Sequence, residues 1–292
     1  MVTRRKFIQQ SSVFAAALMV NKTELLKMHK DLGLQLYTVR DEVKDIKNTL
    51  QKISAAGYTN LELYGYTNRM FFGNTVKQFA ELLKQNNLKT VSGHYGLFDM
   101  LHAPNYNWDS WKYLIEDATI LGNKYVTIPY LDDKHRTGDD FKRVAERLNK
   151  GGELSAKAGI TTAYHNHNFE FEKDGDITKY EILLNNTDAK LVKFEMDLYW
   201  VAYAEQNPVD WFKKYPGRFP MWHIKDMEAA TAVAPKGQTC EVGKGIIDWK
   251  TIFASQKIAG LDYAFVEQEQ YRQPVFDCIK VSADYMKKNL LK

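Results

Sequence analysis

The sequence predicts an α/β fold, a (β/α)8 TIM barrel, and two observations lead to this prediction. From Asp31 onward, short apolar strands alternate with amphipathic helices eight times. No Pro/Ser-rich linker and no abrupt change of composition divides this part of the chain. Eight alternating units are typical of a closed parallel barrel, because doubly wound sheets usually have fewer strands. We therefore expect a single catalytic domain over residues 31–292.

Runs of apolar, β-branched and aromatic residues predict strands at 32–37, 60–64, 89–94, 125–130, 161–171, 192–197, 219–225 and 263–267. Helical periodicity predicts helices at 43–56, 75–87, 108–121, 139–158, 178–185, 208–214, 249–255 and 274–290. Gly57, Gly122 and Gly159 directly follow three of these helices, and glycine is a common residue just past a helix end. We also expect Asp248 to cap the helix that follows it.

Two connections, 96–107 and 227–248, are longer than usual for such a barrel. Both follow strands, so we expect them at the catalytic mouth, where long ordered loops often act as lids. The glycines Gly243 and Gly245 in the second connection lack the strand and the third glycine of a dinucleotide-binding motif. We interpret them as loop geometry.

Composition and charge exclude several classes of protein. Apolar residues make up 45% and charged residues 26%, which is the balance of an ordinary globular domain. The formal net charge is +4, and Arg4, Arg5 and Lys6 carry three of these charges, so the rest of the chain is close to neutral. A near-neutral body offers no electrostatic footprint for nucleic acid. Cys240 and Cys278 are the only cysteines, so no disulfide framework organises the fold.

The first 22 residues are expected to form an export signal. Arg4, Arg5 and Lys6 precede a short apolar run at 13–20, the pattern of a secretory signal. The paired arginines followed by Phe7 and Ile8 are similar to a twin-arginine signal, an address read by the twin-arginine export machinery. The run is much shorter than the ~20 residues that span a bilayer, so no stable membrane span is expected. We expect a periplasmic protein; a basic amphipathic helix in a cytoplasmic protein is the alternative.

The stretch at 161–171 carries two histidines at the end of an apolar strand. His165 and His167 lie two residues apart, so they would share one face of that strand. In a barrel, this position lies at the mouth where catalytic residues gather. Taken alone, the pair could equally be a hydrogen-bonded structural feature, and its interpretation depends on the other strands.

Other predicted strands end in polar residues that also lie two positions apart. A barrel interior would not tolerate so many ionisable groups unless they had partners. Carboxylates and imidazoles that converge from separate strands suit a divalent cation, whereas an interior network of ion pairs is the alternative. These residues are Ser92 and His94, Glu195 and Asp197, His223 and Lys225, and Glu267 and Glu269, with Gln35 and Glu62 at comparable points.

The segments 35–41, 164–171, 196–197, 222–226 and 266–267 resemble the xylose-isomerase-like barrel superfamily. That superfamily includes sugar and sugar-phosphate isomerases, ketose 3-epimerases, inosose dehydratases and endonuclease IV-type enzymes. Its epimerases hold one metal with Glu, Asp, His and Glu from strands five to eight. The resemblance therefore implies Asp197, His223 and Glu267 as metal ligands.

This chain has His165 where those epimerases have the strand-five glutamate. An imidazole also binds divalent metals, so the resemblance implies one ion, Mn²⁺ first, with Zn²⁺, Co²⁺, Fe²⁺ and Mg²⁺ as alternatives. The loss of one carboxylate disfavours a symmetric two-glutamate epimerisation. The histidine-containing strand is more similar to the inosose-dehydratase-like branch.

We expect a sugar isomerase or epimerase that acts on a ketosugar through an enediolate; the alternatives are a ketosugar dehydratase or hydratase, and a non-catalytic sugar-binding barrel. Nothing resembles a phosphate cradle, which favours an unphosphorylated sugar. An endonuclease IV-type activity is disfavoured because the multi-zinc, histidine-rich site and the basic face are lacking. The oligomeric state stays open.

Several residues are assigned roles in this reaction. Glu267 or Glu269 is the expected base, and His167 or His94 the expected acid. Lys225 would bind a substrate oxygen or stabilise an enolate, or else pair with Glu195 or Glu269. The expected substrate-binding residues are Glu62, Tyr37, Trp108 and Arg40. Helix packing is the alternative role for Trp108.

Overall fold

The computed structural model describes residues 31–291 of the chain. The predicted export signal at 1–22 lies outside the described residues. Within 31–291, none of the helices combines the length and the apolar character that crossing a membrane requires.

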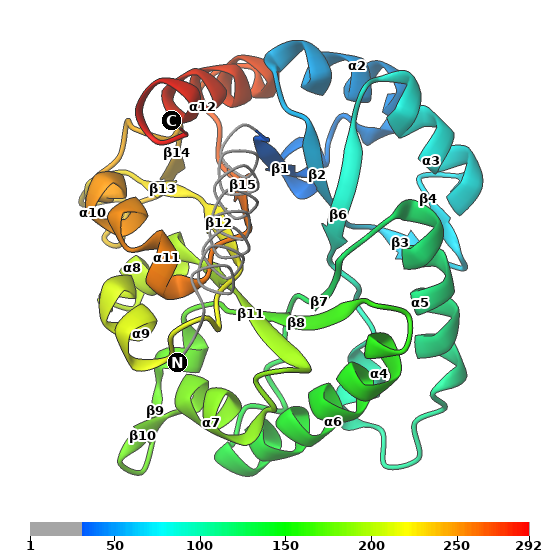
Figure 1. The fold of residues 1–292 in the computed structure, drawn as a ribbon. Coiled ribbons are helices and arrows are strands. Elements are labelled where there is room, and N and C mark those ends of the chain that lie inside the picture. The colour runs from blue at the N-terminus through cyan, green and yellow to red at the C-terminus, as the bar shows by residue number, and fades with distance from the viewer. Residues whose placement is uncertain (1–30, 292) are drawn as a thin grey trace, which may run out of the picture.

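Eight parallel strands form the barrel, and a ring of helices surrounds them in chain order (Figure 1). The order of the strands is β6-β2-β1-β15-β12-β11-β8-β7, and an isolated bridge between His94 and Thr127 links the two outer strands, β6 and β7. The prediction of a (β/α)8 barrel is confirmed. The strands are β1 (Gly33–Gln35), β2 (Asn60–Leu63), β6 (Lys89–Gly93), β7 (Tyr125–Ile128), β8 (Thr161–His165), β11 (Val192–Asp197), β12 (Met221–Ile224) and β15 (Tyr263–Val266).

The outer helices agree with the predicted ones to within a few residues, and the last of them packs beside the first (Figure 1). Gly57 and Gly122 adopt the left-handed conformation at helix ends, as expected, and the Asp248 side chain accepts a hydrogen bond from Thr251 N. The helices are α2 (Ile46–Ala56), α3 (Val76–Gln85), α5 (Asp109–Leu121), α6 (Gly138–Ala156), α7 (Lys179–Asn186), α9 (Pro208–Lys214), α10 (Trp249–Ala254) and α12 (Val275–Asn289).

The inside of the barrel is layered because side chains alternate along each strand. A buried apolar cluster that includes Ala163, Met221 and Phe265 forms one layer. A Cβ on Gly33 would lie 2.5 Å from the Phe265 ring, so only glycine leaves room for that ring. The next inward positions on the same strands are His165, His223 and Glu267, so the polar layer lies directly above the apolar one.

The prediction that one strand spans 161–171 is wrong at its end. β8 stops at His165, and the chain turns through a short 3-10 helix, η3 (Phe169–Phe171). The buried Glu170 carboxylate accepts hydrogen bonds from Tyr164 Oη at 2.7 Å and from His167 N at 2.9 Å. These two bonds fold the segment back, so His167 lies beyond the strand rather than on it.

Several short elements were not predicted, and they lie mostly in the connections. The first long connection contains α4 (Phe98–His102), and the second contains β13 (Asp226–Met227) and β14 (Thr239–Cys240). The other elements are η1 (Leu36–Val39), η2 (Val43–Asp45), β3 (Tyr66–Thr67), β4 (Met70–Phe71), β5 (Asn74–Thr75), β9 (Lys173–Asp174), β10 (Ile177–Thr178), α8 (Leu198–Tyr203) and α11 (Gln256–Ala259).

The second long connection is held by one buried carboxylate. Asp226 accepts hydrogen bonds from the backbone N–H groups of Gly243 and Gly245 and from Trp249 Nε1. A Cβ on Gly245 would lie 2.2 Å from Asp226 Oδ1, so this glycine is required for the close approach. The glycines therefore serve loop geometry, as the sequence suggested.

Candidate metal centre

Four side chains from four strands meet at the carboxyl end of the barrel. His165 Nε2 lies 3.2 Å from His223 Nδ1, and His223 Nδ1 lies 2.9 Å from Glu267 Oε2. Asp197 Oδ2 lies 3.4 Å from His165 Nε2, and all four residues are buried. One donor atom from each residue can be chosen so that all lie within 4.8 Å of one another. The structure thus brings together the four residues that the resemblance implied, and their role as ligands stays a prediction.

Hydrogen bonds on the outer side of each ring fix which nitrogen faces this centre. His165 Nδ1 lies 3.2 Å from the carbonyl oxygen of Pro129, and His223 Nε2 lies 2.7 Å from Glu62 Oε2. Both partners can only accept, so each of these nitrogens carries its hydrogen. His165 Nε2 and His223 Nδ1 then face the centre, as in metal sites where a second hydrogen bond orients each histidine.

The carboxylates also fit a bound cation. Asp197 Oδ2 is buried and accepts no well-aligned hydrogen bond, although Lys225 Nζ lies 3.1 Å from it. A buried carboxylate oxygen without an aligned donor is costly unless a charge or a metal compensates it. Two imidazoles and two carboxylates are a donor set that binds borderline divalent metals.

Glu62 supports this centre from below and does not line the cavity above it. Its carboxylate is fully buried and accepts hydrogen bonds from Gln35 Nε2 at 2.7 Å and Ser92 Oγ at 2.6 Å, besides that from His223. We expected Glu62 to contact substrate. In this structure the carboxylate is enclosed by its partners and orients His223, which favours a supporting role, and a contact with substrate stays a prediction.

His94 lies between two carboxylates and contributes to the cavity wall. Its Nε2 lies 2.7 Å from Glu195 Oε2 and 3.2 Å from Glu62 Oε2. Burial lowers the pKa of His94, but Glu62 and Glu195 outweigh burial and leave the pKa raised. His94, His165, Glu195 and His223 also lie close enough to hold a cation. We favour the set with Asp197 and Glu267, because Glu195 is already bonded to His94.

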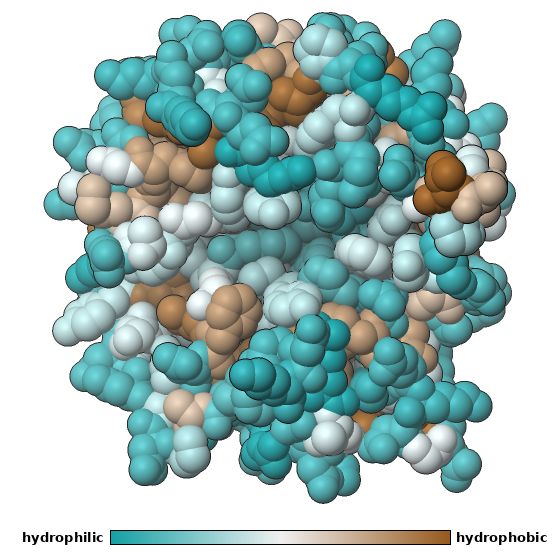
Figure 2. Space-filling model, turned by 180° about the vertical axis from the view of Figure 1, so that it is seen from behind, coloured by the Kyte–Doolittle hydropathy of each residue, from teal (hydrophilic) through white to brown (hydrophobic). Residues whose placement is uncertain are grey.

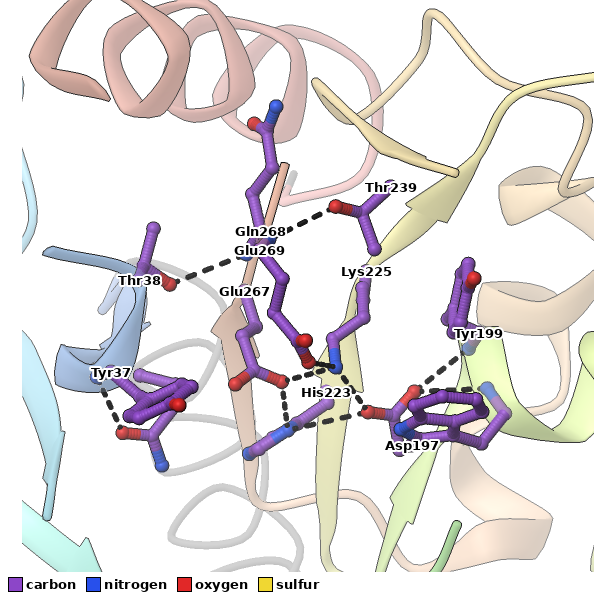
Figure 3. A network of polar contacts seen from close by, with 12 residues as sticks. Tyr37, Thr38, Asp197, Tyr199, His223, Lys225, Thr239, Glu267, Gln268 and Glu269 are labelled. Carbon is purple, nitrogen blue, oxygen red and sulfur yellow. Dashed lines mark hydrogen bonds and ion pairs between the residues drawn. The ribbon is translucent and has the colours of Figure 1, made fainter. Parts of the chain in front are cut away.

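Lys225 links three carboxylates at the edge of the centre (Figure 3). Its Nζ lies 2.6 Å from Glu269 Oε1 and 2.9 Å from Glu267 Oε2. Burial opposes its charge, but Asp197, Glu267 and Glu269 more than offset burial and raise the pKa of Lys225 well above its usual range. Lys225 is therefore an ammonium group, and of the two pairing partners that we considered, the structure has Glu269.

A cavity of about 440 Å³ opens above the centre. Figure 2 shows the face opposite to that of Figure 1; it is hollowed near its centre, and hydrophilic residues gather in the hollow. One part of the cavity wall is ionisable and includes Lys225, Glu267 and Glu269, whereas the rest is mostly aromatic. The lining residues are Tyr37, Tyr64, His94, Phe98, Pro129, Tyr130, His165, His167, Trp200, Lys225, Glu267 and Glu269.

His167 faces the cavity as a neutral imidazole. Its ring centroid lies 5.0 Å from that of His165 and 5.4 Å from that of Trp200, and its Nδ1 is buried without a hydrogen-bond partner. Burial, reinforced by His165 and Lys225, lowers the pKa of His167 well below its usual range. Of the two predicted acids, His94 is thus the one whose surroundings favour the protonated form.

Three of the predicted substrate-binding residues differ in how they relate to the cavity. Tyr37 lines it. Arg40 lies behind the wall, where it donates to the Glu269 carbonyl oxygen at 2.9 Å and covers the Tyr37 ring at 4.9 Å. Trp108 is outside the wall and packs against Tyr106 and the core, which favours the alternative role in helix packing, and its contact with substrate stays a prediction.

The cavity residues that the sequence did not reveal are mostly aromatic. Tyr64 and Tyr130 end predicted strands, so the same reasoning that selected Tyr37 could have found them. Trp200 lies on α8, a helix too short to show periodicity, and no sequence signal marks it.

A family model described as "Xylose isomerase-like TIM barrel" matches residues 50–288 of the chain. An inosose dehydratase from Clostridium botulinum (strain Alaska E43 / Type E3) is 32% identical over 218 residues, which cover 68% of this chain and 70% of that protein. A solved sugar phosphate isomerase/epimerase from Parabacteroides distasonis ATCC 8503 is 28% identical, with a TM-score of 0.76, and the match covers 90% of this chain and 96% of that one.

The IolI protein, solved with a bound zinc atom, has a TM-score of 0.67 at 16% identity, covers 89% of this chain and 98% of that one, and is similar in fold alone. The fold and the relatives define the protein as an isomerase, epimerase or lyase built on this type of barrel. The chain belongs to the xylose isomerase-like TIM barrel family.

Proposed function

We propose that the protein is a divalent-metal-dependent lyase that removes water from an unphosphorylated ketosugar or cyclic keto-polyol. One observation carries this proposal: the cavity has a carboxylate and an ammonium group on one side, Glu269 and Lys225, and imidazoles on the other, His94 and His167. Such an unlike pair of proton-transfer groups suits an elimination, in which a proton is taken from one place and given at another. The inosose dehydratase relatives support the same reaction class.

The metal would be held by His165, Asp197, His223 and Glu267, with Mn²⁺ as our first choice and Zn²⁺, Co²⁺ and Fe²⁺ as alternatives. When bound, the cation supplies Lewis-acid polarisation of the substrate carbonyl. Mg²⁺ suits the site less because it prefers oxygen ligands, and two of the four ligands are imidazoles.

The protein's own groups account for the movement of protons. The Glu269 carboxylate takes the proton from the carbon next to the carbonyl, and the electrons of that C–H bond form the enolate. The Lys225 ammonium, 2.6 Å from Glu269, stabilises the negative oxygen. The enolate then expels the hydroxyl group on the next carbon, which takes a proton from the His94 imidazolium and leaves as water.

The remainder of the cavity fits an uncharged polyol. Tyr37, Tyr64, Tyr130 and Trp200 present ring faces or edges, which pack well against the C–H faces of sugar rings. Lys225 is the only lysine or arginine among the lining residues that the structure describes, and three carboxylates surround it. A phosphate group would find no cation of its own, which favours an unphosphorylated substrate.

A sugar isomerase or epimerase is the second candidate. The similarity to the Parabacteroides distasonis isomerase/epimerase over 90% of this chain favours it. In this case Glu269 would remove a proton from one carbon, and either the protonated Glu269 or the His94 imidazolium would return a proton to carbon.

Incubating the metal-loaded protein with inososes and ketohexoses in D2O separates these functions. Elimination predicts a new ultraviolet absorbance from a carbonyl conjugated to a double bond. Isomerisation or epimerisation predicts a new sugar with deuterium next to the carbonyl and no such absorbance. Binding without conversion would identify a sugar-binding barrel and contradict both. Glu269→Gln should keep binding and lose turnover, whereas Glu172→Gln, which alters an exposed carboxylate paired with Lys179, should keep both.

A further inference from the structure

A second group of metal-binding side chains lies in two connections at the same end of the barrel. His102 is the last residue of α4, and Asp132 and His135 lie between β7 and α6. Both histidines lie in connections, where side chains are usually exposed to solvent. The His102 side chain is instead only 12% exposed, and its ring stacks on that of His135 with a centroid separation of 3.9 Å.

The three donor groups converge on one point. His135 Nδ1 lies 2.8 Å from Asp132 Oδ2, and His102 Nε2 lies 3.6 Å from the same oxygen. One donor atom from each residue can be chosen so that all three lie within 4.8 Å of one another. Ligands at roughly 2.0–2.1 Å from a tetrahedral zinc ion lie about 3.3 Å apart, so small side-chain rotations would place an ion between them.

His102 Nε2 itself indicates a missing partner. It is buried and makes no hydrogen bond, because 3.6 Å is too long for one. Buried polar nitrogens nearly always have a bonding partner. A metal cation, bound through the lone pair of the imidazole nitrogen, would be such a partner.

Asp132 is also oriented for this role. Its Oδ1 accepts a hydrogen bond from Lys134 N at 2.9 Å and also lies 2.9 Å from His135 Nδ1, whereas Oδ2 is directed to both imidazoles. Two imidazoles and one carboxylate form the ligand set of many zinc sites that keep a fourth position for water.

We propose that a divalent cation of the Zn²⁺ type binds between His102, Asp132 and His135, with water completing its coordination. This site shares no residue with the barrel centre. It would join the connection that contains α4 to the one that follows β7. Phe98 at the start of α4 and Tyr130, two residues before Asp132, both line the cavity, so the ion would fix two parts of its wall.

Metal analysis of tag-free protein tests this site. Apo-protein is loaded with Zn²⁺, passed through a desalting column and analysed for bound zinc. We expect about two ions per wild-type chain, about one in His102→Ala and in Asp197→Asn, and about none in the double variant. Asp139→Asn, an exposed carboxylate paired with Lys142, is the matched control and should keep the wild-type content.

The two sites can fail independently in this design. If His102→Ala binds as much zinc as the wild type, the proposed site between His102, Asp132 and His135 is overturned, whatever Asp197→Asn shows. If only the barrel centre is wrong, Asp197→Asn keeps the wild-type content and His102→Ala loses the ion. Asp132→Asn, which preserves the side-chain shape, repeats the test should His102→Ala fold poorly.

Hydrogen exchange gives a second readout in the Asp197→Asn background. An ion that joins the two connections must lower the population of opened states in which these connections separate. With free Zn²⁺ at 100 times its dissociation constant, this population should fall by a factor of about 100. We expect the amides of α4 to exchange more slowly by up to this factor. Unchanged exchange with saturating Zn²⁺ would overturn the proposal.

Discussion

Replacing Glu62 by Gln removes a negative charge behind His223 while it keeps the side-chain shape. In the protein, Glu62 Oε2 lies 2.7 Å from both His223 Nε2 and Gln35 Nε2, and Oε1 lies 2.6 Å from Ser92 Oγ. The amide oxygen of Gln can still accept from the first two groups. Its NH2 group can donate to Ser92 Oγ, which turns its hydrogen toward Thr127 Oγ1, 3.0 Å away. The variant therefore tests the charge alone.

The expected effect is a weaker metal site. Loss of a partner that orients a histidine ligand typically costs roughly 10–100-fold in metal affinity. Because the Glu62→Gln variant keeps the hydrogen bond to His223 and loses only the charge, we expect the lower end of this range. The predicted loss is about tenfold, which corresponds to about 1.4 kcal/mol of binding free energy.

Competition between the apo-protein and a chromogenic chelator for Zn²⁺ measures this difference in affinity. Both the parent protein and the Glu62→Gln variant carry His102→Ala, so that only the barrel centre is titrated. Glu170→Gln is the matched control, because Glu170 is also fully buried and bonded to Tyr164 and the His167 backbone. Its affinity should stay within about twofold of the parent. If Glu62→Gln also stays within that limit, Glu62 does not support a metal ligand and our account of His223 is wrong.

Two further substitutions test other parts of the account. Burial raises the pKa of Glu170 from 4.5 to about 7. Between these pH values the folded state holds a proton that the unfolded state has lost. The free energy of unfolding should therefore fall by about 3 kcal/mol as pH rises through this window. Urea unfolding between pH 5 and 8 should show a steeper loss of stability with rising pH in the wild type than in Glu170→Gln; equal slopes would contradict it. Lys225→Met removes a positive charge 3.1 Å from Asp197 and 2.9 Å from Glu267, so metal should bind at least about tenfold more tightly while turnover is lost; weaker binding in the chelator assay would refute this.

The barrel and the gathering of polar side chains at its mouth could be predicted because both depend on simple periodicity, whereas the resemblance to the family selected the four clustered residues. Alternating strands and helices indicate the fold, and alternation within each strand places His165, His223 and Glu267 on the inside. Asp197 follows by the same rule, since it lies two residues from Glu195 on the same face of β11. These positions depend on each strand by itself, and that information is local to the sequence.

The depth of each residue in the barrel could not be predicted in this way. Neighbouring strands are staggered along the barrel axis, and no single strand reveals the stagger. Glu62 pairs with Gln35 and Ser92, and this places its carboxylate under His223 instead of in the cavity. Alternation along a strand predicts which face a residue occupies but not its position along the barrel axis. For this reason the sequence predicts that Glu62 contacts the substrate.

Irregular segments limited the prediction in a different way. The end of β8 depends on the Glu170 carboxylate, whose bonds to Tyr164 and His167 override the apparent strand periodicity. The stacking of His102 on His135 joins two connections that are 33 residues apart in the chain. Such contacts depend on how the connections pack over the barrel, and neither segment carries a periodic pattern that predicts it.

Anomalous scattering from a crystal of the Mn²⁺-loaded protein tests the central claim most directly. Data collected at an energy where manganese scatters strongly locate the ion without reference to activity. We predict a peak roughly 2.0–2.3 Å from one donor atom each of His165, Asp197, His223 and Glu267. A fully loaded crystal with no peak between these four side chains would contradict the claim that they form the metal centre.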